Sequence, residues 1–175
     1  ALLRHMPKGW EQDFEVIGAP VDWCGLNYYT RKLIAADDGP WPGLHEVEGP
    51  LPKTQMGWEI YPEGLEFFHT PTHEIYTRGL PLYVTENGMA NADVLRAGEV
   101  QDPERSRYIE AHLAAVRRAI GAGVPVAGYY VWSLLDNYEW SLGYDKRFGL
   151  VHVDFQRFQR TPKASYHALA RALAR

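Results

Sequence analysis

The alternation of apolar and polar positions along the chain predicts three strands. Each is a short, mostly apolar run that ends in polar or aromatic residues, and the runs are Val21 to Tyr29, Leu82 to Thr85 and Val126 to Leu135. The third run is apolar at consecutive positions, which is typical of a parallel strand buried on both faces. Such a strand belongs in the interior of an α/β domain.

Helical periodicity fills the intervals between these strands. Pro62 to Arg78 carries apolar residues at roughly helical spacing, although Pro71 should kink or break that helix. A more regular helix begins at Asp102-Pro103, where an N-cap acceptor precedes a proline in the first turn, and it is closed by Gly121 and Gly123. Its apolar stripe consists of Ile109, Leu113, Val116 and Ile120.

A last helix is predicted to open at Thr161-Pro162, with Tyr166, Leu169 and Leu173 as its inner stripe. The resulting order of strand and helix, repeated, implies parallel strands joined by right-handed crossovers. Three such units are too few to close an eight-stranded barrel, which typically needs about 250 residues. The stretch Asp37 to Thr54 is rich in proline and glycine, and we expect a long loop there on the working face of the fold.

Composition restricts the kinds of partner. The chain has 175 residues and 46% hydrophobic content, enough to bury a core, and its formal net charge is -4. This balance offers no basic surface for nucleic acid and no polybasic or long apolar segment for a membrane, so a neutral substrate fits better. No repeat or flexible linker is present, and we therefore expect a single domain over residues 1–175.

Several residues are expected to carry no chemistry. Cys24 is the single cysteine and lies in an apolar run, so we interpret it as a core residue. His69 and His73 have a spacing that can hold a metal on a helix, but Pro71 disturbs that geometry and no third ligand is evident. We expect neither a metal nor a cofactor. The first residues do not resemble a signal peptide, which favours a cytoplasmic location, but the chain lacks an initiator Met and leaves that question open.

Candidate functional residues follow the second and third strands, where reactive groups gather in parallel α/β folds. Glu86 stands at the tip of the second strand, before an expected Asn87-Gly88 turn, and a lone glutamate there is more often a solvated loop acid. Two tryptophans and two acids crowd the end of the third strand, namely Trp132, Asp136, Glu139 and Trp140. Sites that bind sugars combine aromatic platforms with carboxylates, so this combination favours a carbohydrate site.

Structural interpretations of these residues compete with the functional one. Trp132 alone is more often a core aromatic, and Trp140 alone is more often a loop anchor. Glu139 is harder to explain in this way, because a buried carboxylate needs partners.

These residues resemble glycoside hydrolase family 1, whose barrel carries its nucleophile in a Thr-Glu-Asn-Gly motif after the seventh strand. Tyr83 to Gly88 matches that motif, and four further runs match in the family's order: Gly25 to Thr30, Gly57 to Leu65, Trp132 to Trp140 and Gly143 to Leu150. The resemblance implies the C-terminal portion of a (β/α)8 TIM barrel, containing strands six to eight. The first five strands and the family's acid/base glutamate are missing from this chain.

The resemblance implies a retaining β-glycosidase of the β-glucosidase type. Such an enzyme hydrolyses terminal non-reducing β-D-glycosyl residues of a small β-glycoside by double displacement. Glu86 would be the catalytic nucleophile, Tyr29 would donate a hydrogen bond to it, and Asn27 would help to order the same region.

The resemblance also implies the residues that bind substrate. Trp132 would form the floor beneath the sugar ring, and Glu139 and Trp140 would grip hydroxyl groups at its far edge. Trp58 would lie on the aglycone side, and Phe148 would be either a pocket wall or an ordinary core residue. Relatives that act on 6-phosphorylated sugars replace the carboxylate at Glu139, so its presence favours an unphosphorylated glycoside.

Two hypotheses follow for the chain as a molecule. It is part of an active β-glycosidase, completed by the missing N-terminal barrel segment or a complementary chain, or it is by itself a non-catalytic fragment that binds sugar weakly. The lack of a general acid and the open edges of a three-stranded sheet favour the second reading for the isolated chain. We expect partial disorder, aggregation or a partner chain in a sample that contains these residues alone.

Overall fold

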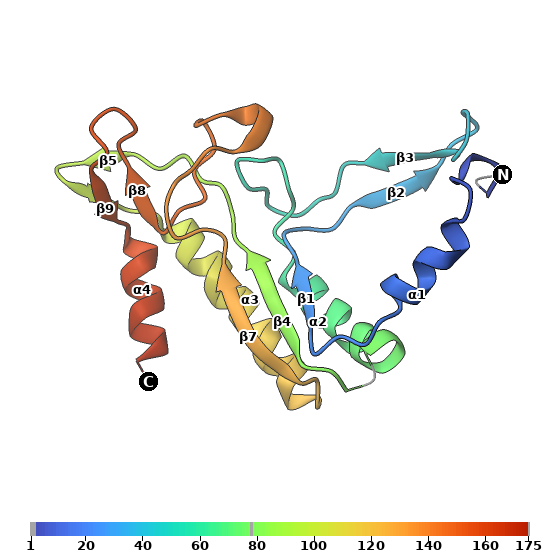
Figure 1. The fold of residues 1–175 in the computed structure, drawn as a ribbon. Helices are drawn as coiled ribbons and strands as arrows, with labels where there is room; N and C mark the ends of the chain where they lie inside the picture. The colour runs from blue at the N-terminus through green and yellow to red at the C-terminus, as the bar shows by residue number, and fades with distance from the viewer. Residues whose placement is uncertain (1–2, 78, 175) are drawn as a thin grey trace.

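The structure is a computed structural model that describes residues 3–77 and 79–174, with the backbone alone at residues 3 and 68–71. Its centre is a parallel sheet in the order β1 (Cys24–Asn27), β4 (Leu82–Asn87) and β7 (Val126–Val131), shown in Figure 1. The three predicted strands are therefore present and parallel. β1 and β7 are shorter than the apolar runs that predicted them, whereas β4 continues two residues further than expected, to Asn87.

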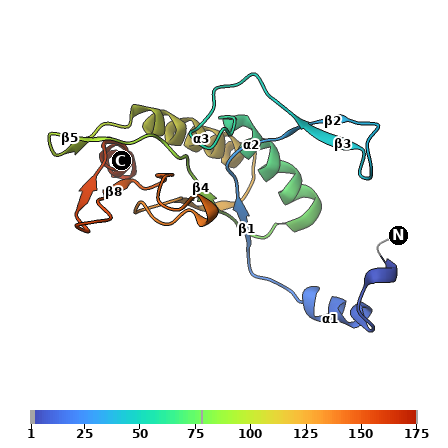
Figure 2. The same ribbon diagram turned by 90° about the horizontal axis from the view of Figure 1, so that it is seen from above.

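Two helices cover one face of this sheet, α2 (Pro62–Pro71) and α3 (Pro103–Gly121) (Figures 1 and 2). α2 gives way after Pro71 to the π-helical segment η3 (Thr72–Thr77), so the α-helix ends where the proline was expected to disturb it. Arg78, the predicted end of this segment, lies outside the described residues. The predicted stripe of α3 is largely correct, but Ile120 is 49% exposed, and at that end of the helix the fully buried Ala119 packs against the core instead.

The core lies between these helices and the sheet. One part of the core joins β1, β4 and β7 to the helices. It consists of Tyr28, Leu65, Leu82, Val84, Val116, Ala119 and Val124. A second cluster lies near the carboxyl ends of the strands and consists of Met89, Tyr108, Ile109 and Leu150. Cys24 is partly buried and packs against the first of these groups, in agreement with its interpretation as a core residue.

The opposite face of the sheet is open. Trp23 and Tyr130 are 52% and 58% exposed there, and with Tyr83 and Thr85 they line a cavity of about 480 Å³. In the described part of the chain, this face has no helical layer comparable to α2 and α3 (Figure 2).

Three small antiparallel hairpins surround the sheet. They pair β2 (Leu33–Ala36) with β3 (Leu44–Val47), β5 (Leu95–Arg96) with β6 (Glu99–Val100), and β8 (Val151–Val153) with β9 (Arg160–Pro162). The stretch Asp37 to Thr54 is therefore not a continuous loop, because it contains β3. The shorter helical segments are η1 (Leu3–His5), η2 (Trp10–Gln12), α1 (Asp13–Ile17) and η4 (Trp140–Leu142).

The last helix, α4 (Ala164–Leu173), begins later than predicted, because Thr161-Pro162 is part of β9 and pairs with β8. Of its predicted inner stripe, Leu169 packs against the core, whereas Tyr166 is 37% and Leu173 is 73% exposed. Figure 1 shows α4 at the side of the molecule, and it contacts α3.

Asp102 occupies the N-cap position of α3, but its side chain makes no capping bond there. Its Oδ1 instead accepts a hydrogen bond of 2.8 Å from the backbone N–H of Ser165, in the first turn of α4, and its Oδ2 accepts one of 2.6 Å from the Ser165 hydroxyl. The capping acceptor predicted for one helix therefore serves another.

Within residues 3–77 and 79–174, no helix is both long and apolar enough to cross a membrane. The side chain of His69 lies outside the described residues, so the predicted geometry of His69 and His73 is not tested. The side chains that are described contain no group of three or more His, Cys, Asp or Glu residues that could hold a metal ion.

Candidate active site

Glu86 lies near the carboxyl end of β4, the central strand of the sheet. Tyr29 follows the neighbouring strand β1, and its hydroxyl donates a hydrogen bond of 2.6 Å to Oε2 of Glu86. The backbone N–H of Tyr28 also donates to the carbonyl oxygen of Glu86, at 2.9 Å. Burial, followed by the bond to Glu86, raises the pKa of Tyr29, so the phenol stays protonated as a donor. The expected contact between Tyr29 and Glu86 is present.

Asn27 lies beside this pair, at the end of β1. Its Oδ1 accepts a hydrogen bond of 2.7 Å from the Thr85 hydroxyl, which joins the ends of β1 and β4 next to Glu86. Asn27 is exposed on the open face of the sheet. Its position agrees with the expected ordering of the region.

The loop after β7 brings a second carboxylate toward Glu86. Burial, and then the charge of Glu86, raises the pKa of Glu139, and the charge of Glu139 in turn helps to raise the pKa of Tyr29. In the described residues neither glutamate takes part in an ion pair. Two carboxylates of like charge therefore influence each other without a cation to neutralise either.

The two predicted tryptophans of this loop differ in environment. Trp132 is half-buried, and its backbone N–H donates to the carbonyl oxygen of Asn87 at 2.9 Å, which ties the loop to the end of β4. Trp140, in η4, is 81% exposed and contributes little to the core. Trp132 is thus placed next to β4, whereas Trp140 is open to solvent.

Trp58 and Phe148 complete an aromatic cluster with Tyr29. The ring centroids of Tyr29 and Trp58 are 5.4 Å apart, those of Tyr29 and Phe148 are 6.1 Å apart, and those of Trp58 and Phe148 are 6.2 Å apart. These distances lie in the range of favourable aromatic pairs. Phe148 is 3% exposed and packs against the tyrosine that contacts Glu86, as a core residue would, while its role as a pocket wall stays a prediction.

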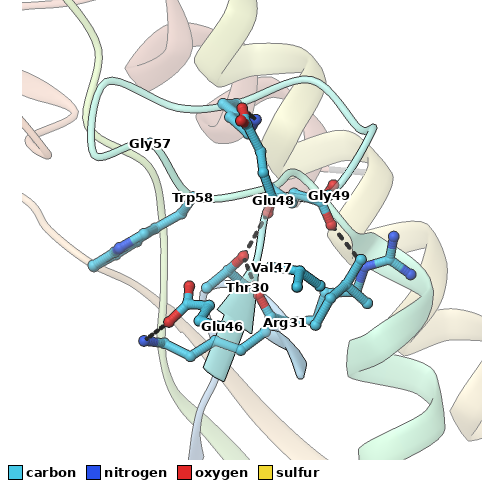
Figure 3. A pocket seen from close by; sticks show the side chains of 12 residues that line it. Thr30, Arg31, Glu46, Val47, Glu48, Gly49, Gly57 and Trp58 are labelled. Carbon is cyan, nitrogen blue, oxygen red and sulfur yellow. Dashed lines mark hydrogen bonds and ion pairs between the residues drawn. The ribbon is translucent and has the colours of Figure 1, made fainter. Parts of the chain in front are cut away.

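A cavity of about 500 Å³ lies on the other side of Trp58, between the β2–β3 hairpin and the segment 48–59 (Figure 3). It begins at Thr30, directly after Tyr29, and its walls carry the ion pairs Arg31–Glu59 at 2.7 Å, Lys32–Glu46 at 2.6 Å and Lys53–Glu48. Sequence reasoning missed this wall. The pattern held no signal for it, because two of these pairs join residues 28 and 14 positions apart.

A buried ionic network holds the loops that follow β4 and β7. Asp136 accepts hydrogen bonds from Arg147 at 2.6 Å and from Lys163 at 2.8 Å, and Lys163 reaches Asp93 at 2.5 Å. Arg105 pairs with Asp93 at 2.7 Å, and it also pairs with Asp102. Asp136 is one of the two acids that drew attention to the third strand. Its four hydrogen-bond partners give it a structural role and leave it outside the candidate site around Glu86.

The expected turn at Asn87-Gly88 is wrong. Asn87 is the last residue of β4 and is 0% exposed, since its amide finds partners in the core instead of in a turn. Gly88 is required by a close approach, because a Cβ there would come within 1.8 Å of the carbonyl oxygen of Trp132. The glycine therefore lets the end of β4 lie against the loop that carries Trp132.

The family model for glycosyl hydrolase family 1 matches residues 3–173. The chain belongs to this family. It is 45% identical over 163 residues to a 1,4-beta-D-glucan glucohydrolase from Thermotoga neapolitana, and 43% identical over 163 residues to Beta-glucosidase A from Thermotoga maritima. Each alignment covers 93% of this chain and 36% of the relative.

A solved family 1 structure has the same fold. The family 1 β-glucosidase from Thermotoga maritima, in complex with isofagomine lactam, superposes with a TM-score of 0.93 at 41% identity, over 98% of this chain and 39% of that one. The predicted fold class is therefore confirmed: β1, β4 and β7 with their helices form a portion of an α/β barrel. The chain spans less than two fifths of the length of these relatives.

Proposed function

We propose that this chain carries the nucleophile part of a retaining β-glycosidase of the β-glucosidase type. The proposal is carried by one observation, the 2.6 Å hydrogen bond from Tyr29 to Glu86 at the carboxyl end of a barrel strand. The family match and the names of the relatives, a glucohydrolase and a β-glucosidase, support a β-glucoside as substrate. Residues 1–175 would then belong to one barrel domain.

In the proposed mechanism, Glu86 attacks the anomeric carbon of the glycoside. The bond to the leaving oxygen breaks as a second carboxylic acid protonates it, and a covalent glycosyl–enzyme ester forms on Glu86. The second group then removes a proton from water, which attacks the anomeric carbon and releases Glu86. The donor hydroxyl of Tyr29 orients the attacking carboxylate in both steps.

The remaining site residues are proposed to bind the sugar. Trp132 offers an apolar face next to Glu86, and Glu139 with the indole N–H of Trp140 would hold hydroxyl groups. Burial and the charge of Glu86 raise the pKa of Glu139, and hydrogen bonds donated by sugar hydroxyl groups would favour its charged form. Trp58 would face the aglycone, with Phe148 and Tyr29 packed behind it.

The general acid is proposed to come from barrel strands outside this chain. Two features of the sheet support this. Trp23 and Tyr130 are exposed on its open face, and β1 and β7 are edge strands among the described residues. Both features are expected of a surface that further strands cover. An N-terminal barrel segment, or a complementary chain that supplies one, would complete the site.

The test joins this chain to the N-terminal barrel part of Beta-glucosidase A from Thermotoga maritima, and we refer to this protein as the joined barrel. It should release the aryl alcohol from an aryl β-glucoside, and Glu86→Gly should abolish that release. If the Glu86→Gly protein turned over at the rate of its parent, the assignment of the nucleophile would be wrong.

The second reading concerns the chain by itself, as a non-catalytic fragment. The open face of the sheet favours this second reading, since the side chains on that face have no covering layer in the described residues. The same assay on the isolated chain should give no turnover, because the leaving group would depart without a general acid. Turnover by the isolated chain would refute this reading.

A further inference from the structure

Asn87 follows Glu86 in the chain, and its side chain lies fully buried behind the site. Its Nδ2 donates to the carbonyl oxygen of Tyr28 at 2.7 Å and to the hydroxyl oxygen of Tyr108 at 3.1 Å, and its Oδ1 accepts from the Tyr129 hydroxyl at 2.5 Å. A backbone carbonyl can only accept, so the bond to Tyr28 fixes which end of the amide is the NH₂ group. The amide therefore joins β1, α3 and β7 around the end of β4.

Tyr108 extends this network to the residue that contacts Glu86. Its hydroxyl accepts from Asn87 and donates to the carbonyl oxygen of Tyr29, at 3.1 Å. The peptide group before the Tyr29 Cα is thus held by Asn87, and the peptide group after it is held by Tyr108. Tyr108 is 1% exposed and belongs to α3, whose core contacts fix its position. The backbone of Tyr29 is therefore held by hydrogen bonds to the peptide groups on both sides of its Cα atom.

The strand ladders are irregular at this point. The register of β1 against β4 shifts between Leu26 and Asn27, and that of β4 against β7 shifts between Val84 and Asn87. Such irregularities re-aim side chains near active sites and leave backbone groups without ladder partners. The side chains of Asn87 and Tyr108 donate hydrogen bonds to the backbone carbonyl groups of Tyr28 and Tyr29. In a regular sheet, backbone N–H groups of a neighbouring strand donate such bonds.

We propose that Tyr108, oriented by Asn87, is a positioning residue that sets the hydrogen bond from Tyr29 to Glu86. This inference rests on the proposed function and deepens it. An O–H···O⁻ bond of 2.6 Å is short and charge-assisted, and such a bond weakens steeply when its distance or angle changes. A small displacement of the Tyr29 backbone therefore alters the orientation of the attacking carboxylate.

The first test uses Tyr108→Phe in the joined barrel. This substitution keeps the ring that stacks on His112, with centroids 3.9 Å apart, and removes the hydroxyl alone. We expect kcat for an aryl β-glucoside to fall about tenfold with KM nearly unchanged, because one positioning hydrogen bond is lost. In a Tyr29→Phe background the same substitution should have no further effect on kcat, since the bond that it controls is already gone.

The matched control is Val116→Ala, a buried position two turns further along α3. It should lower the thermal unfolding temperature and leave kcat nearly unchanged in both Tyr29 backgrounds. If Tyr108→Phe reduced kcat by the same factor with and without the Tyr29 hydroxyl, it would act independently of Tyr29 and the proposal would be overturned.

A second readout needs no turnover. The ¹³Cζ resonance of Tyr29 reports the state of its hydroxyl, and we expect Tyr108→Phe to move it in the direction produced by Glu86→Gln, whereas Val116→Ala leaves it in place. An unmoved resonance in Tyr108→Phe would overturn the proposal. A shifted resonance in a joined barrel that hydrolyses no β-glycoside would support the positioning role and refute the proposed function.

Discussion

Two groups of carboxylates follow the strands of this sheet, and they differ in what surrounds them. Asp93, Asp102 and Asp136 are buried and lie against arginine or lysine side chains. Glu86 lies at the end of β4, before the loop that carries Asp93, and Glu139 lies in the loop after β7, near Asp136. In the described residues neither takes part in an ion pair. The first group is paired with cations, whereas in the described residues the second group faces a like carboxylate and is paired with none.

The difference separates stability from chemistry. A buried ion pair whose hydrogen bonds are all satisfied costs a great deal to break, although it contributes less to stability than its gross attraction suggests. A carboxylate that faces another carboxylate destabilises the folded protein by electrostatic repulsion. Such pairs are typical of catalytic sites. Removal of one member from each group should therefore have opposite consequences.

Glu86→Gln is expected to have the largest effect. In the joined barrel it should lower kcat for an aryl β-glucoside by about 10⁴-fold or more, because an amide does not form the glycosyl ester. The thermal unfolding temperature should stay the same or rise, since the charge beside Glu139 is removed. Both quantities come from one preparation, by a rate assay and a melting curve. A clear loss of thermal stability would place Glu86 in the structural group instead.

Asp136→Asn should show the reverse. It leaves Lys163 and Arg147 without the charge that they share, and the free energy of unfolding should fall by about 3–5 kcal/mol. Denaturant unfolding of the joined barrel measures this change. The matched control is Asp145→Asn, an exposed aspartate in the same region, which should be nearly neutral. Equal effects at the two positions would contradict the structural role of Asp136.

His112 provides an intermediate case, a buried titratable group that has no carboxylate partner. Its Nδ1 faces the carbonyl oxygen of Tyr108 at 2.7 Å, its Nε2 has no hydrogen-bond partner among the described residues, and burial lowers its pKa from 6.5 to about 4. As pH falls, the unfolded chain binds this proton first. The free energy of unfolding is therefore highest above pH 6.5 and decreases as pH falls from about 6.5 to about 4.

His112→Phe isolates this contribution, because it keeps an aromatic ring against Tyr108. Between pH 7 and pH 4 the parent protein should lose up to about 3 kcal/mol more stability than the variant. Denaturant unfolding at several pH values measures the difference. Parallel curves for the two proteins would mean that His112 is not buried in its neutral form.

Ser165→Ala should have the smallest effect. The Ser165 hydroxyl donates to Asp102, but Arg105 and the Ser165 backbone N–H still hold that carboxylate. We expect a loss of about 1 kcal/mol in the free energy of unfolding, measured by denaturant unfolding. Ser141→Ala, at an exposed position, is the control and should be neutral. A loss as large as that of Asp136→Asn would show that the capping bond, rather than the ion pairs, dominates the network.

Features that depend on neighbouring residues in the sequence could be predicted from it. Glu86 follows a recognisable apolar run, so the pattern predicts its place at the end of a strand. Its contact with Tyr29 was implied by the family resemblance and is present in the structure. The helix at Pro103 was equally accessible, because its period and its opening proline are local signals.

Features that depend on distant partners could not be predicted. Asn87 was interpreted as a turn residue because Asn-Gly favours turns locally, yet its amide bonds residues 21, 42 and 59 positions away. The β2–β3 hairpin was hidden in the same way, since proline and glycine mark the ends of β3 but not its pairing. The residue pattern alone offered no reason to separate Asp136 from Glu139, and only the family resemblance did so, because burial and ion pairing, which hold Asp136, depend on distant residues.

The bond from Asp102 to the first turn of α4 has a consequence for the order of folding. It spans 63 residues, so the last helix cannot complete its amino end from its own neighbourhood. We expect α4 to stay frayed in the early stages of folding and to become stable after α3 has docked on the sheet, since that event brings Asp102 to it. Protection of the α4 amide groups from hydrogen exchange would then show that α3 has docked on the sheet.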